Sequence, residues 1–146
     1  MRKLAIAMLM ALTAVGAQAL GIDVPYTAFA TADAVTSVQL CGTWGAKRAG
    51  EFRVIHAERQ AQSFVYVQWM ARDTDGIRQA THTLAIDELD NDHADIALGD
   101  LTCRATPHGI VLTAKADSGH DPRIHRVTIE INRTPGRYTF RAHRMR

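Results

Sequence analysis

Only two cysteines occur in the 146 residues, Cys41 and Cys103, and they stand far apart. Their spacing excludes the Cys-x-x-Cys pair of thiol oxidoreductases and the four-ligand pattern of structural zinc. The chain also lacks the Gly-x-Ser-x-Gly elbow of hydrolases and the His-Glu-x-x-His of metalloproteases. These absences remove the common catalytic signatures, and we expect a protein that is not an enzyme and has no cofactor.

Long apolar runs are scarce as well, because only one occurs, at residues 4–15. The basic residues Arg2 and Lys3 precede it and the small-residue ending Ala17-Gln18-Ala19 follows, which is the order of a secretory signal peptide. The run is too short to span a bilayer, which takes about 20 residues. We therefore predict export to the periplasm or the extracellular space, with no stable membrane insertion after cleavage behind Ala19.

This interpretation divides the chain into three parts. Residues 1–19 are the predicted signal peptide and residues 20–34 a leader segment without helical or strand periodicity. Residues 35–146 are predicted to form one domain, which is long enough to bury a core. In an oxidising compartment, an isolated cysteine pair more often forms a structural bridge than a redox or metal site. We predict a Cys41–Cys103 disulfide.

The domain consists of short apolar runs separated by turn residues, which predicts antiparallel strands. Glycine, proline and aspartate fill the separations, as in "DTDG", "PHG", "DSGHDP" and "RTPG". The predicted strands are 35–44, 50–57, 62–72, 77–86, 95–98, 101–106, 110–116, 125–132 and 137–143. A helix at 85–94 is disfavoured by its many aspartates. The fold class is all-β, a single small antiparallel barrel or sandwich of about eight or nine strands with one disulfide.

Residues 62–72 ("QSFVYVQWMAR") have apolar side chains on both faces of the predicted strand. Phe64, Tyr66 and Met70 fall on one face, and the other face carries Val65, Val67 and Trp69. A strand with two apolar faces is typical of the centre of a sheet that is covered on both sides.

The segment Gly42-Thr43-Trp44 resembles the Gly-x-Trp of the first strand in lipocalins, exported eight-stranded barrels that hold small apolar ligands. The resemblance implies a carrier with an apolar cavity, for which Trp44, Phe64 and Trp69 are candidate lining residues. The alternative is that these three aromatic residues fill a core. Lipocalin-like transport is therefore one of the alternative functions.

The chain is also similar in class and size to periplasmic lysozyme inhibitors, which are small exported β-barrels with disulfides. Those families insert a Ser-Gly-x-x-Tyr loop into the lysozyme cleft. Here Ser118-Gly119 is followed by His120, Asp121 and Pro122, so the tyrosine is absent. We claim no membership of that family.

Two clusters of histidine and aspartate raise the alternative of a divalent-metal or enzymatic domain. They are His120-Asp121 with His125, and the acidic run 87–95 with His93. The acidic run lacks the glycine and glutamate of an EF-hand loop. Ser118, His120 and Asp121 are triad residue types, but neighbours on an extended chain do not surround one substrate atom. Solvated acidic turns explain both clusters, and we assign no metal ligand and no catalytic residue.

Charge is distributed unevenly along the chain. Loss of Arg2 and Lys3 with the signal peptide would leave no net charge, but residues 87–100 are acidic and residues 123–146 carry seven arginines against Glu130 alone. Strand alternation places Arg137, Arg141 and His143 on one face, and Arg126 outward on the preceding strand.

The sequence therefore predicts an exported, non-catalytic envelope protein. Its arginine-rich face would bind or inhibit an acidic protein, or bind an anionic envelope polymer, because guanidinium groups recognise carboxylates and phosphates. The alternative is that these charges only solvate an outer strand. Nucleic acid is not an expected partner of an exported protein.

Overall fold

The protein is a sandwich of two antiparallel β-sheets. The structure, a computed structural model, describes residues 19–20, 22–23, 34–90 and 95–145. Ten strands occur in these residues: β1 (Ala19–Leu20), β2 (Ile22–Asp23), β3 (Ala34–Trp44), β4 (Gly50–Arg59), β5 (Gln62–Arg72), β6 (Arg78–Ala85), β7 (Ile96–Thr106), β8 (Gly109–Ser118), β9 (Asp121–Asn132) and β10 (Arg137–Arg144). A short 3-10 helix, Ala46–Arg48, connects β3 to β4.

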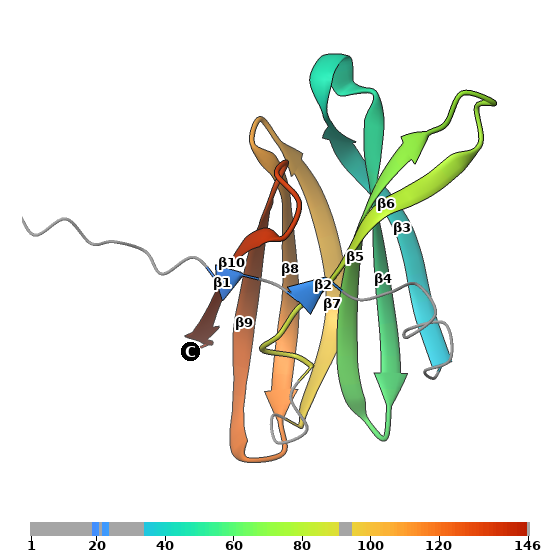
Figure 1. The fold of residues 1–146 in the computed structure, drawn as a ribbon. Helices are drawn as coiled ribbons and strands as arrows, with labels where there is room; N and C mark the ends of the chain where they lie inside the picture. Colours follow the sequence, from blue (N-terminus) through green and yellow to red (C-terminus); the bar gives the residue numbers. More distant parts are fainter. Residues whose placement is uncertain (1–18, 21, 24–33, 91–94, 146) are drawn as a thin grey trace, which may run out of the picture.

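Each sheet is a meander of four consecutive long strands. Sheet A has the order β1-β10-β9-β8-β7, and sheet B has the order β2-β6-β5-β4-β3. The two sheets lie as separate layers and do not close into a barrel (Figure 1). The all-β prediction is confirmed, and of its two alternatives the sandwich is the correct one.

The main core lies between the two sheets. Sheet B contributes Phe52, Val54, Val67 and Trp69, and sheet A contributes residues such as Leu112, all of them buried. Strand β5 is central in sheet B and buried along nearly its whole length. Its second face is apolar too, because a smaller cluster lies on the side away from sheet A: Ile55, Ala57, Phe64, Tyr66 and Ala85. The prediction of a two-faced central strand is confirmed.

A buried polar link connects the sheets across this core. Ser63 Oγ on β5 accepts the backbone N–H of Leu98 on β7 at 2.8 Å and lies 3.0 Å from Nε2 of His56 on β4. Burial lowers the pKa of His56, although Glu58 opposes the shift. The imidazole is therefore favoured in its neutral form, in which Nε2 can accept the proton of the Ser63 hydroxyl.

Two expectations about the strands are corrected by the structure. The predicted strands 95–98 and 101–106 form one continuous strand, β7, with a register shift between Gly99 and Thr102. Asp100 has a φ of 54° there, so the Gly99-Asp100 signal marks a β-bulge and not a turn. The leader segment 20–34, in which the sequence shows no strand period, contains β2, Leu20 of β1 and Ala34 of β3. Strands of two residues are too short to show a period in the sequence.

Those two short strands pair with different sheets. β1 pairs with β10 at the edge of sheet A, and β2 pairs with β6 at the edge of sheet B. Residues 1–18 of the predicted signal peptide lie outside the described residues.

Candidate functional site

The candidate site is the face of sheet A that points away from sheet B. Leu112 on β8 and Ile129 on β9 pair with each other, and both are buried in the core. Their chain neighbours Thr113 and Thr128 pair in the same way. Since successive side chains of a strand point to opposite faces, these threonines lie on the outer face.

The same alternation defines four outward rows across the sheet. From one end to the other these rows are Thr106, Gly109 and Asn132 beside Arg137; Arg104, Val111, Glu130 and Thr139; Thr102, Thr113, Thr128 and Arg141; and Gly99, Lys115, Arg126 and His143. We define the basic face as the exposed cationic residues of these rows, namely Arg104, Lys115, Arg126, Arg137, Arg141 and His143.

The structure thus brings together all four residues that the sequence proposed for binding. Arg126 pairs with His143 in the register of β9 and β10, and Arg141 lies one row away. Arg137 begins β10 at the other end of the same face. Their role in binding stays a prediction, but their placement on one side of one sheet agrees with the alternation argument.

Two members of the basic face have acidic partners. Arg141 Nη1 lies 2.8 Å from Glu130 Oε1, and Lys115 Nζ lies 2.9 Å from Asp100 Oδ2. All four side chains are well exposed, so these pairs contribute little to stability and exchange readily with other charges.

The remaining arginines give this face its positive character. Within the described residues, Arg104, Arg126 and Arg137 make no ion pair. Asp117, at the far end of β8, adds a third acidic side chain to the two already paired. Cationic side chains still outnumber acidic ones on this side of the sheet.

Sequence reasoning missed Arg104 and Lys115. Each is a single cation on a strand distant from the arginine-rich C-terminal region, and the chain order does not show that β7 and β8 extend the same face. The usable signal was local: Lys115 alternates with the buried Ala114 and Ala116 and therefore had to point outward.

The three aromatic candidates for a cavity do not line one site. Trp69 is fully buried between the sheets, makes an edge contact with Phe52 and donates its Nε1–H to the carbonyl oxygen of Arg133 at 3.1 Å. Phe64 lies on the opposite side of sheet B, where the Arg59 guanidinium is 4.9 Å from its ring centre.

Trp44 lies at the margin of the core. Its Nε1–H is shared between the carbonyl oxygens of Glu51, at 3.2 Å, and Met70, at 3.1 Å. Gly50 is its partner in the register, and a side chain there would collide with the indole ring. The glycine therefore allows the indole to pack directly against the sheet.

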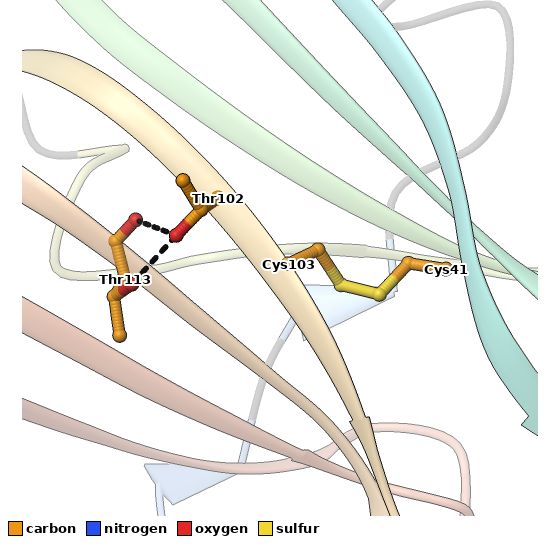
Figure 2. The surroundings of a disulfide bond; sticks show 4 residues. All are labelled: Cys41, Thr102, Cys103 and Thr113. Atoms are coloured by element: carbon orange, nitrogen blue, oxygen red, sulfur yellow. Dashed lines mark hydrogen bonds between the residues drawn. A yellow bond between two sulfur atoms is a disulfide. The ribbon is translucent and has the colours of Figure 1, made fainter.

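The predicted disulfide is present, and it joins the two sheets at one edge. Cys41 on β3 and Cys103 on β7 are bonded, with their Cα atoms 6.2 Å apart. Figure 2 shows Thr102, the neighbour of Cys103, pointing away from the bridge to meet Thr113. Next to Cys41, a Cβ on Gly42 would stand 2.8 Å from Ile110, so the glycine lets the edge of sheet B approach sheet A closely.

The histidine and aspartate clusters have other partners. Asp121 Oδ1 is 2.6 Å from Arg123 Nε, which lowers the pKa of the carboxyl group, and Asp121 Oδ2 is 3.7 Å from His125 Nε2. Across the part of the chain that the structure describes, no group of three or more potential ligands is placed to hold a metal ion. His93 and its neighbours at 91–94 lie outside that part.

No protein-family model, no curated protein and no solved structure matches this chain. No helix among the described residues is long and apolar enough to cross a membrane. The fold and the site define the protein as a disulfide-bridged β-sandwich of two meanders, with a cationic outer face on the C-terminal sheet.

Proposed function

We propose that this protein is an exported, non-catalytic binding protein whose basic face engages an anionic partner of the cell envelope. The observation that carries the proposal is the register of sheet A, which gathers cations from all four long strands onto one outward surface. A solvated edge needs charge only on its outermost strand. Arg126 and Lys115 lie on the interior strands β9 and β8, so edge protection does not account for them.

Arginine suits this role because its guanidinium is planar and always charged. It donates two parallel hydrogen bonds to a carboxylate or a phosphate group. The unpaired Arg126 and Arg137 need not break an existing ion pair to do so. A ligand would bind at a surface of high dielectric, so the attraction must weaken as salt is added.

The described residues favour binding over catalysis. The Asp121 carboxylate is bonded to Arg123 and lies near His125, so it does not orient His120 toward Ser118 as a triad requires. The disulfide is compatible with an oxidising compartment outside the cytoplasm, as the predicted signal peptide requires.

The test uses two immobilised anionic probes, polyglutamate as an acidic polypeptide and polygalacturonate as an acidic polymer. We expect binding to at least one probe at low salt and its loss at high salt. The variant Arg126→Gln/Arg137→Gln/Arg141→Gln should bind at least about tenfold more weakly. Arg78→Gln is the matched control, because it removes an exposed guanidinium from sheet B. Equal binding by the triple variant and this control would overturn the proposal.

A further inference from the structure

Two hollows lie on the outer face of sheet A, one toward each end of the basic face. The first has a volume of about 340 Å³, and its polar lining includes Thr106, His108, Asn132, Arg137 and Thr139. The second, of about 330 Å³, is lined by Asp100, Thr113, Ala114, Lys115 and Arg126. Each hollow therefore combines a cationic side chain without an ion pair, Arg137 or Arg126, with hydroxyl or amide groups. Each also contains one carboxylate that already has a cationic partner, Glu130 with Arg141 in the first hollow and Asp100 with Lys115 in the second.

The strand geometry fixes the separation of the hollows. Asn132 in the first and Arg126 in the second lie on the same strand, β9. At about 3.4 Å per residue, the step between them spans about 20 Å. Between Arg137 and Arg126 the surface carries the row of Thr102, Thr113 and Thr128, in which Thr102 and Thr113 bond through their hydroxyls at 2.7 Å and Thr113 also lines the second hollow. A ligand that fills both hollows must be extended and must cross this hydroxyl-bearing strip.

The chemistry of the strip favours a sugar chain over a protein. Protein interfaces generally centre on buried aromatic or large apolar anchors. The exposed large apolar residues of the described chain are Val35, Val38 and Leu40 on β3, together with Ile77 and Ile124, and none of them lines either hollow. A polysaccharide presents hydroxyl groups, and an acidic polysaccharide adds the anions that arginine binds.

One polar atom in the first hollow also lacks a partner. Oγ1 of Thr139 is shielded from solvent and makes no hydrogen bond within the described part of the chain. A buried hydroxyl without a partner is costly, and rotation of the side chain toward a bound ligand would satisfy it.

We propose that an extended acidic polysaccharide lies along β8 and β9 and occupies both hollows at once. One anionic group sits at Arg137 and another at Arg126 and Lys115, while sugar hydroxyls meet the threonines between them. The anion can be a carboxylate or a sulfate, since both bind a guanidinium. This inference rests on the proposed anion-binding function and specifies its ligand.

The experiment is a calorimetric titration with size-defined oligogalacturonates at low salt. Oligomers that span about 20 Å should bind at least about tenfold more tightly than those too short to reach both hollows, because the second contact becomes intramolecular. Arg137→Gln or Arg126→Gln alone should reduce the long oligomer to the affinity of the short one. Arg78→Gln should leave both affinities unchanged. Size-matched sulfated oligomers distinguish the two anions, and uncharged dextran oligomers should not bind.

A second variant separates ligand contact from folding. Thr139→Val removes the hydroxyl while keeping the shape, so the free energy of unfolding should not fall, but affinity for the long oligomer should drop about threefold or more. Arginine-dependent binding without any dependence on length would refute the two-hollow inference and leave the anion-binding function standing. Binding of polyglutamate with no binding of charged oligosaccharides would have the same consequence. No binding to any anionic probe would refute both.

Discussion

The effect of the disulfide on stability can be predicted most quantitatively. The bond joins edge strands of two sheets that are otherwise built from local hairpins. Cys41 and Cys103 are 62 positions apart, so the bond closes a long loop in the unfolded chain. In the chain-entropy model, a loop of this length corresponds to about 4 kcal/mol of stability. With a urea dependence of about 2 kcal/mol per molar, reduction should lower the midpoint of unfolding by about 2 M. The melting temperature should fall by about 15 °C.

The assay is urea unfolding of the purified protein, followed by tryptophan fluorescence with and without reductant. Fully buried Trp69 reports on the core between the sheets. The variant Cys41→Ala/Cys103→Ala should unfold at or below the midpoint of the reduced protein, because both cysteines also pack against the core. Reductant should have no effect on this variant, which makes it the control.

Two outcomes would refute the reasoning. If reduction shifts the midpoint by less than about 0.5 M, the bridge does not restrict the unfolded chain as the loop length requires. If reductant also destabilises the double alanine variant, the effect arises elsewhere in the protein.

The remaining predictions concern hydrogen bonds of the core. Trp69→Phe should cost about 1–3 kcal/mol, because the Arg133 carbonyl oxygen loses its donor, and this is measured by urea unfolding. Tyr138→Phe should cost a similar amount, since the hydroxyl donates to Glu88 at 2.7 Å and accepts the backbone N–H of Asp87 at 3.1 Å. Burial and Glu88 also raise the pKa of this phenol, so Tyr138 should stay protonated in an absorbance titration while the protein is folded. His56→Gln should flatten the loss of stability as the pH falls below about 6.5, measured by unfolding at a series of pH values.

The sign of the last effect follows from the direction of the pKa shift. Burial holds the pKa of His56 below its value of 6.5 in the unfolded chain. Between those two pKa values the unfolded state binds more protons, so the free energy of unfolding falls as the pH decreases through this window. A wild-type pH dependence identical to that of His56→Gln would contradict this argument. For Trp69 and Tyr138, a loss below about 0.5 kcal/mol would contradict the hydrogen-bond assignments.

Many of the strands could be predicted from the sequence, because a strand with a buried face has apolar side chains at regular intervals along the chain. The apolar residues on both faces of 62–72 placed this segment in the middle of a sheet, and the structure has β5 at that position. Asp73–Gly76 was predicted as a turn and connects β5 to β6, where the Asp73 carboxylate accepts backbone N–H groups of Asp75 and Ile77. Such signals are local, so they can be read without the tertiary structure.

Features that depend on distant residues could not be predicted in the same way. Gly99-Asp100 is typical of a turn in the sequence. In the structure β7 pairs with β8 both before and after the register shift at these two residues, so the strand is continuous and the two residues form a β-bulge. Phe64 was grouped with Trp69 as core or cavity lining, although the two occupy opposite faces of sheet B. Alternation along the strand already placed the two residues on opposite faces, but only the position of sheet A shows that the face of Trp69 forms the core between the sheets.

The basic face illustrates which features could be predicted from the sequence and which depended on the tertiary structure. The alternation of strand side chains by itself predicted that Arg126, Arg137, Arg141 and His143 point outward, because each of them is next to an apolar residue in the chain: Val127, Tyr138, Phe140 or Ala142. The sequence also predicted the cysteine pair, since two isolated cysteines behind a predicted signal peptide favour one bridge. Only the tertiary structure decided that the sheets stay open and that Arg104 and Lys115 extend the same surface. Whether the sheets close, and which side chains become neighbours on the outer face, depends on how the strands pair and in which register. Local sequence patterns do not encode that pairing.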